Sequence, residues 1–271
     1  HSTAVPTGEI RGQIVPPGVT VGFANLSGLQ EVPAIASGAS AQGGVTVNRN
    51  TGRATIHVTT RSVVDPTAAH LHEAPGGRNG SVLIPLTQDG SDPRHWFAVD
   101  QVVSAAALAA FDAGSTDGEI RGQVVPPDIL FVVNRLDGGH EVPAKTTAGQ
   151  GTVAVTVNRV TRGLVLHANV TGVDDAGSAH IHQAYAGQVG SVIVPLVKDG
   201  ADATHWSSTG AVLTEAQFAS LAQGKLYVNV HTPANPAGEI RGQLVPPGVH
   251  LVQTAMSGAE EDPPVGTTAA G

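Results

Sequence analysis

The sequence AHIHQAYAGQVGSVIVPL, residues 179–196, decides the fold class because a strand, a turn and a second strand follow one another in it. Side chains alternate between the two faces of a strand, so His180 and His182 are expected on the same face. The glycines within residues 187–190 indicate a turn, and the aliphatic residues 192–194 indicate the next strand. The sequence AHLHEAPGGRNGSVLIPL, residues 69–86, has the same arrangement 110 residues earlier. This internal duplication predicts two similar domains.

Two further repeated motifs set the domain boundaries. The hexapeptide GEIRGQ occurs at residues 8–13, 118–123 and 238–243, and two aliphatic residues and Pro-Pro follow each copy. The segment LSGLQEVP, residues 26–33, has related copies at residues 136–143 and 256–263. These spacings predict one repeat over residues 19–128 and a second over residues 129–248. Residues 1–18 then correspond to the terminal strand segment of a preceding repeat, and residues 249–271 to the initial strand segment of a following repeat.

The composition limits the classes of fold and function. The 271 residues include 34 glycines, 18 prolines and only 3% aromatic residues, which suits many short strands joined by tight turns. The chain has no cysteine, which excludes disulfides and thiolate metal sites. Its net charge of −8, with no cluster of lysine and arginine, argues against a nucleic-acid partner, and no apolar run is long enough for a membrane span. Because the sequence starts at His1 without methionine, we expect a removed signal peptide and an extracellular or cell-surface location.

The two repeats differ in one predicted strand. In the second repeat, residues 225–233 read KLYVNVHTP and predict an alternating strand that carries His231. The first repeat has only three residues between Gly114 and Gly118, so it lacks this strand. Residues 1–13 align with residues 231–243 without a gap and offer a partial substitute. Each repeat also contains a short predicted helix, over residues 104–114 and 214–224, and Thr214 and Gln217 predict a capping box at the start of the second.

Together these motifs resemble the CHRD domain, first named for its occurrence in chordin. The matching sequences are the LSG and EVP motif, the AHIH strand with its glycine turn, LYVNVHT and GEIRGQ. The resemblance implies an all-β chain of two tandem antiparallel Greek-key sandwiches, distantly similar to copper/zinc superoxide dismutase, each with one short helix. The first repeat departs from the family pattern because it lacks the LYVNVH strand, which counts against a complete metal site there.

The histidines form the candidate metal site. His180, His182 and His231 would supply three imidazoles from two strands, a donor set that suits copper or zinc. The analogy with superoxide dismutase makes copper the first expectation and zinc the second. The alternative interpretation is that these histidines hydrogen-bond the glycine turns and only fix the loops. The other candidate ligands are two further histidines of the second repeat, four histidines at equivalent positions of the first repeat and the terminal histidine: His205, His167, His70, His72, His95, His57 and His1.

Two classes of function follow. The first is an exported structural module of CHRD repeats, in which copies of the chain form a fibre or array by strand complementation between their termini. The lost strand would leave an open sheet edge, and open edges invite strand addition. The second is a superoxide dismutase-like copper enzyme, in which Arg241 would supply a positive charge near the copper. The structural alternative to this role of Arg241 is an ion pair across strands that involves Glu239 and Arg241. No arrangement of catalytic side chains is evident, so we assign no catalytic residue and favour the structural module.

Overall fold

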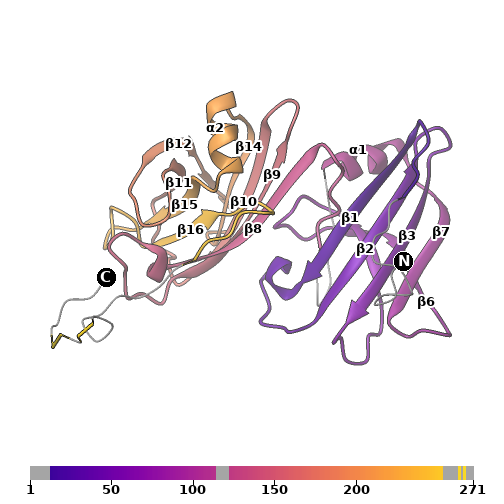
Figure 1. Cartoon of the computed structure of the whole chain (residues 1–271), viewed down its shortest axis with the longest axis horizontal. Helices are drawn as coiled ribbons and strands as arrows, with labels where there is room; N and C mark the ends of the chain where they lie inside the picture. The colour runs from indigo at the N-terminus through magenta and orange to yellow at the C-terminus, as the bar shows by residue number, and fades with distance from the viewer. Residues whose placement is uncertain (1–12, 114–121, 253–261, 264, 267–271) are drawn as a thin grey trace.

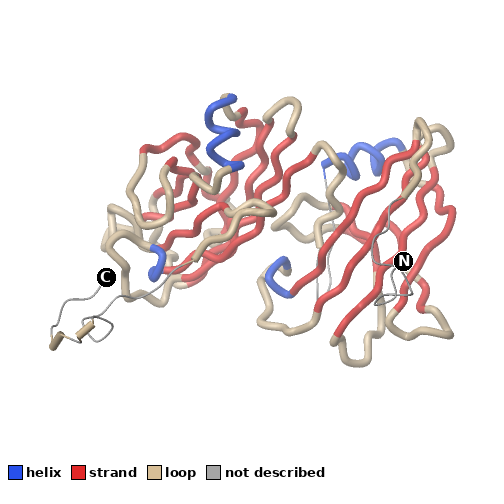
Figure 2. The backbone as a smooth tube through the Cα atoms, in the orientation of Figure 1, coloured by secondary structure: helices blue, strands red, loops and turns tan. Residues whose placement is uncertain are grey.

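The computed structural model describes residues 13–113, 122–252, 262–263 and 265–266, which form two β domains (Figure 1). Strands make up the body of both domains, and one α-helix lies at the upper end of each domain in the view of Figure 2. All strand pairs among the described residues are antiparallel. The predicted all-β fold of tandem sandwiches is confirmed. No helix in the described part of the chain is long and apolar enough to cross a membrane.

Domain 1 contains a five-stranded sheet and a separate strand pair. The sheet has the order β1-β2-β3-β7-β6, and the pair consists of β4 and β5. The elements are β1 (Val19–Ser27), η1 (Gly28–Gln30), β2 (Ser40–Asn48), β3 (Arg53–Arg61), β4 (His70–Glu73), β5 (Ser81–Pro85), β6 (Thr87–Gln88), β7 (His95–Val102) and α1 (Ala105–Ala113).

Domain 2 contains one nine-stranded sheet of the order β12-β11-β15-β16-β8-β9-β10-β14-β13. Its two ends approach each other, because β11 contacts β13 and β12 contacts β14, so the sheet encloses one core. The elements are β8 (Ile129–Asp137), η2 (Gly138–His140), β9 (Gln150–Asn158), β10 (Gly163–Thr171), β11 (Ser178–Gln183), β12 (Ser191–Pro195), β13 (Val197–Lys198), β14 (His205–Val212), α2 (Glu215–Ala222), β15 (Leu226–His231) and β16 (Ile240–Leu244).

The alternation of the sequence fixes which strand face is buried. Leu226, Val228 and Val230 of β15 are completely buried in the core of domain 2. Each such side chain contributes about 1.5–3 kcal/mol when it is removed from water. At the start of α2, Thr214 accepts a hydrogen bond from the Gln217 backbone N–H while the Gln217 side chain bonds the Thr214 N–H. The predicted helix and its capping box are therefore confirmed.

The described part of domain 1 has no equivalent of β15, as the sequence predicts. In domain 2, β15 pairs with β11 on one side and with β16 on the other. The equivalent of β11 in domain 1 is β4, which pairs with β5 and with no other strand among the described residues. Beside β4 lies an apolar groove whose cavity volume is about 40 Å³ and which is lined by residues such as Gly43, Val45 and Leu71.

A glycine turn of domain 1 packs against domain 2. The turn at residues 75–80 lies against the outer face of β9 and β10, where Asn169 Nδ2 donates a hydrogen bond of 3.0 Å to the Gly77 carbonyl oxygen. Gly77 has a φ of +82°, and a Cβ placed there would lie 3.0 Å from the Cβ of His167 and 3.2 Å from that of Ala154. A glycine at this position thus lets the two backbones approach closely.

This close approach predicts different effects for two matched substitutions. Gly77→Ala and Gly187→Ala carry the same cost of a positive φ, which is +82° and +75° respectively, but a Cβ at Gly187 would meet nothing within 4 Å. We expect Gly77→Ala to lower the free energy of unfolding by about 1–3 kcal/mol more than Gly187→Ala, because only the former overpacks a contact. Denaturant unfolding of both variants measures this difference. Equal losses would contradict a close contact between the domains.

Candidate functional site

Three histidines of domain 2 converge on the outer face of the sheet. His180 and His182 alternate with the buried Ile181 on β11, and His231 ends β15, the neighbouring strand. The register pairs Ser178 with His231 and His180 with Asn229, so His231 lies diagonally across from His180. One nitrogen from each of the three imidazoles lies within 4.8 Å of the others. The histidines that the sequence singled out first are therefore neighbours in space.

Backbone carbonyl groups fix the tautomers of two of these imidazoles. His182 Nδ1 donates a hydrogen bond of 2.9 Å to the Gly190 oxygen, and His231 Nδ1 donates one of 3.2 Å to the Pro236 oxygen. Each bond leaves Nε2 of the same ring as an acceptor, and that of His231 lies at hydrogen-bond distance, 3.2 Å, from His180 Nδ1. The Nε2 atom of His182 is buried and has no hydrogen-bond partner. Buried polar atoms of this kind call for a specific explanation, and a metal ion would supply one.

The distance between two of the imidazoles fits a shared metal ion. His180 Nδ1 lies 3.2 Å from His231 Nε2. Two imidazole nitrogens bound tetrahedrally at about 2.0–2.1 Å from one ion would lie about 3.3 Å apart. The donor set is three imidazoles, which suits zinc or copper and leaves a fourth position for another ligand.

The local electrostatics keep the three rings neutral. Burial lowers the pKa of His180, of His182 and of His231, and the neighbouring imidazoles lower the pKa of His180 and of His231 further. The Arg241 guanidinium also lowers the pKa of His182. Because a metal ligand must be unprotonated, these shifts favour binding near neutral pH.

Tyr227 and Arg241 support the site from behind. The Tyr227 ring stacks on His182 at a centroid distance of 4.9 Å, and the Arg241 guanidinium lies 3.4 Å from the centroid of the Tyr227 ring. The Tyr227 hydroxyl accepts a hydrogen bond from the Gly190 N–H, and Arg241 donates to the Gln188 carbonyl. The sequence interpretation overlooked Tyr227, although its alternation with Asn229 and His231 places it on the same strand face.

Arg241 and Glu239 have separate structural contacts. Arg241 is only 2% exposed, so it offers little charge to an approaching solute. Glu239 accepts hydrogen bonds from the Thr147 and Thr232 hydroxyl groups. Among the described residues the two side chains form no ion pair with one another. Arg241 instead holds the turn at residues 185–190, since its second terminal nitrogen donates to the Tyr185 carbonyl.

His167 and His205 lie apart from the three converging histidines and pair with each other. They lie on β10 and β14, and β16, β8 and β9 separate β15 from β10 in the sheet. His167 Nδ1 is 3.0 Å from His205 Nε2, and His205 Nδ1 is 3.2 Å from an Asp199 oxygen. As candidate fourth ligands of the converging histidines, His167 and His205 were therefore wrongly assigned. Asp199, at the Asp-Gly turn before β14, is the partner that the sequence interpretation did not identify.

Domain 1 repeats both arrangements, but the first is incomplete. His57 and His95 stack at 5.3 Å, and His95 bonds Asp89, as in the pair of domain 2. His70 and His72 lie on β4, and His72 Nδ1 donates to the Gly80 oxygen at 3.0 Å. No third donor joins them within the described residues. His1, the proposed substitute, lies outside the described residues.

The His167 pair predicts an acid-sensitive domain 2. Burial, aided by the charges of His205 and Arg78, lowers the pKa of His167 to about 4. The unfolded chain, in which histidine titrates near 6.5, then binds more protons than the folded chain between these values. Neutral His167 therefore does not lower the free energy of unfolding above about pH 6.5. As the pH falls from 6.5 toward 4, protonation of the unfolded chain lowers this free energy.

The substitution His167→Gln tests this, with His57→Gln as the matched control in the more exposed pair. We expect His167→Gln to flatten the dependence of the unfolding free energy on pH between 4 and 6.5 more than His57→Gln does. Denaturant unfolding across this range measures the effect. Equal slopes in the two variants would count against a strongly perturbed His167.

Comparison with known proteins identifies the family. The model of the CHRD domain matches residues 23–124 and 132–244, which form two tandem copies. A protein of Chromobacterium violaceum described as 4-hydroxy-tetrahydrodipicolinate reductase is 28% identical over 189 residues, which are 68% of this chain and 67% of that protein. No solved structure matches the chain. The match of the CHRD model over most of the chain shows that this protein belongs to the CHRD domain family.

Proposed function

We propose that this chain is an exported structural module of CHRD repeats whose second domain binds one metal ion through His180, His182 and His231. The observation that carries the metal site is the buried Nε2 of His182, which has no hydrogen-bond partner and faces two further imidazoles. The carbonyl oxygens of Gly190 and Pro236 orient two of the rings, as outer partners do in established metal sites. When bound, the ion would link β11 to β15 and stabilise the folded domain.

Copper is the first candidate ion and zinc the second. Imidazole is a good ligand for both, and the general order of affinities favours Cu²⁺ over Zn²⁺. The chain has no cysteine, so a thiolate does not compete for either metal.

The assembly role rests on the apolar groove of domain 1. In domain 2 the equivalent space is filled by β15, whose Leu226, Val228 and Val230 are fully buried. A strand from a terminal segment of a neighbouring copy would cover the groove and pair with the edge of β4 on which no described strand lies. Residues 1–13 align with residues 231–243, which begin at the last residue of β15, so His1 is the sequence equivalent of His231.

A superoxide dismutase-like copper enzyme is the second candidate, because His180 and His231 are only partly buried and solvent reaches them. The burial of Arg241 argues against it, since no positive side chain then guides an anion from this position. A superoxide assay of the copper-loaded chain separates the two candidates. We do not extend the reductase activity in the relative's name to this chain. Dinucleotide-binding domains are built on parallel strands, whereas the described strand pairs of this chain are antiparallel.

Removing one ligand tests the metal site. We expect the wild-type chain to bind one equivalent of Cu²⁺ or Zn²⁺ in isothermal titration calorimetry. Loss of a residue that only hydrogen-bonds a metal ligand weakens metal binding by up to about 100-fold. His231→Gln removes a direct ligand, so it should weaken binding by more than about 100-fold. His70→Gln, in the incomplete pair of domain 1, is the matched control and should leave the affinity unchanged. Equal affinities of wild type and His231→Gln would refute the proposed ligand set.

Filling the groove tests strand complementation. Gly43 lines the groove, and Val153 is its equivalent in domain 2. A Cβ at Gly43 would make only ordinary contacts, the nearest at 3.4 Å. We expect Gly43→Phe to occupy the groove and reduce assembly, while Gly43→Val, which introduces the residue found in the same core as β15 in domain 2, should still assemble. Electron microscopy and sedimentation of the full chain measure this. Assembly of the Gly43→Phe variant at the wild-type level would contradict entry of a strand into the groove.

A further inference from the structure

Domain 1 carries a second group of ligand side chains, separate from the two histidines of β4. His57 is exposed on β3, and His95 begins β7, the neighbouring strand. His57 Nδ1 lies 3.0 Å from His95 Nε2, and His95 Nδ1 lies 3.0 Å from an Asp89 oxygen. Asp89, His95 and His57 therefore form a continuous row in which each ring nitrogen has a defined neighbour.

The Asp89 carboxylate decides which nitrogen of His95 can accept. An ionised carboxylate only accepts hydrogen bonds, so His95 Nδ1 donates to Asp89, and His95 Nε2 directs its lone pair toward His57. Asp89 is itself held in place, because one of its oxygens accepts from the backbone N–H and the hydroxyl of Ser91. A carboxylate that holds the far nitrogen of a histidine in this way is a common outer partner of metal sites.

The distance between the two facing nitrogens suits a copper ion. Cu²⁺ favours square-planar or tetragonal sites of nitrogen and oxygen ligands. Two imidazole nitrogens in neighbouring positions of such a site, each about 2.0–2.1 Å from the ion, would lie about 2.8–3.0 Å apart. The nitrogens of His57 and His95 lie 3.0 Å apart. Water can supply the other ligands, because His57 is exposed and the side chain of His95 is 25% exposed.

Binding of an ion requires the proton of His57 to change place. In the hydrogen-bonded pair, His57 Nδ1 donates to His95 Nε2, so this proton must move to His57 Nε2 before Nδ1 can bind a metal. The exposed His57 ring can then donate from Nε2 to water. The pair of domain 1 can therefore exchange its shared hydrogen bond for an ion without leaving a polar atom unsatisfied.

Domain 2 has the same three residue types in the same arrangement, but there they are enclosed. His167 Nδ1 lies 3.0 Å from His205 Nε2, and His205 Nδ1 lies 3.2 Å from an Asp199 oxygen. The side chain of His205 is only 5% exposed. His167 Nε2 is buried and has no hydrogen-bond partner among the described residues. A proton moved to this nitrogen would be a buried donor without an acceptor, which disfavours the tautomer that metal binding needs.

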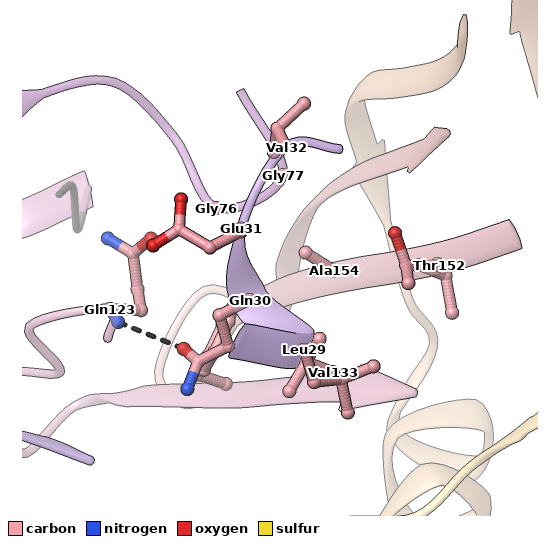
Figure 3. Close-up of a pocket in the computed structure, with 12 residues that line it drawn as sticks. Leu29, Gln30, Glu31, Val32, Gly76, Gly77, Gln123, Val133, Thr152 and Ala154 are labelled. Atoms are coloured by element: carbon pink, nitrogen blue, oxygen red, sulfur yellow. Dashed lines mark hydrogen bonds between the residues drawn. The ribbon is translucent and has the colours of Figure 1, made fainter. Parts of the chain in front are cut away.

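The glycine turn of domain 1 is what encloses the pair of domain 2. Gly76 and Gly77 line the same small pocket at the domain contact as Ala154 of β9 (Figure 3), and Ala154 is the register partner of His167. A Cβ on Gly77 would lie 3.0 Å from the Cβ of His167. His167 is only 8% exposed under this turn, so water cannot complete a coordination sphere there.

We propose that His57 and His95 of domain 1 form a second, exposed Cu²⁺ site, in which Asp89 positions His95 and water supplies the remaining ligands. This site goes beyond the function proposed above and shares no ligand with the three converging histidines of domain 2. It has two protein ligands instead of three, so it binds more weakly, fills only after the first site, and loses its ion when excess metal is removed. The enclosed pair of domain 2 binds no ion.

The test uses a parent chain in which the other histidine groups are broken. The parent carries His70→Gln, His180→Gln and His231→Gln, so its copper binding does not depend on whether the three converging histidines bind a metal. Circular dichroism and thermal unfolding midpoints identify chains that fold like the wild type. The single variant His231→Gln serves as the parent if the triple substitution disturbs folding.

Two pairs of variants of this parent separate a direct ligand from a positioning residue. His57→Gln removes a ligand, and His250→Gln is its control, because His250 is also exposed and belongs to neither pair. Asp89→Asn removes the charge of the outer partner but keeps an acceptor for its turn. Asp92→Asn is the control, because it removes the same charge from a side chain that bonds Arg94.

Calorimetric titration with Cu²⁺ and electron paramagnetic resonance give the first outcome. We expect the parent to bind Cu²⁺ with two nitrogens in the plane of the ion. Asp89→Asn should weaken binding by about tenfold, the lower end of the effect of losing an outer partner. His57→Gln should weaken binding further and leave at most one of the two nitrogens. His250→Gln and Asp92→Asn should leave the affinity unchanged.

NMR spectra of the histidine rings locate the ion in the parent without any further substitution. Cu²⁺ added below one equivalent should broaden the ring signals of His57 and His95 before those of His167 and His205. A parent that binds no Cu²⁺, equal affinities of the parent and His57→Gln, or earlier broadening of the His167 and His205 signals would overturn the proposal.

Discussion

The pairing of β15 with β11 is the contact on which both the candidate metal centre and the difference between the domains depend. It places His231 beside His180 and His182, and it brings Leu226, Val228 and Val230 into the core. In domain 1 no described strand takes this place, and the consequences are two histidines without a third and an apolar groove. One strand thus accounts for the candidate site in one repeat and for the apolar groove among the described residues of the other.

The histidines near this strand have structural hydrogen bonds beside the nitrogens that we propose as metal ligands. His182 fixes the glycine turn through Nδ1, and its buried Nε2 has no hydrogen-bond partner, so fixing the turn and the proposed metal binding would use different atoms of one ring. His72 fixes the corresponding turn in domain 1 in the same way. The second pair, His167 with His205, has an acidic partner, Asp199, and lies under the contact with domain 1. Its equivalent, His57 with His95, is more exposed to solvent.

Much of this arrangement could be predicted from the sequence, because it follows from local rules. Alternation placed His180 and His182 on one face, and the duplication gave the repeats, the two helices and the missing strand. What local rules cannot give is the order of strands in the sheet. The separation of His167 from His231 by three strands depends on that order, and so the two further histidines were wrongly assigned as fourth ligands. The contact of Gly77 with β9 and β10 likewise depends on how two domains dock, which the glycine turn alone does not reveal.

The most direct test of the central claim is X-ray absorption spectroscopy of the wild-type chain after loading with copper or zinc and removal of excess metal. The account predicts one ion per chain whose first shell contains three imidazole nitrogens at about 2.0–2.1 Å, with a fourth ligand from solvent. A first shell made of oxygen atoms, or one with fewer than three imidazoles, would show that β11 and β15 do not hold a common ion.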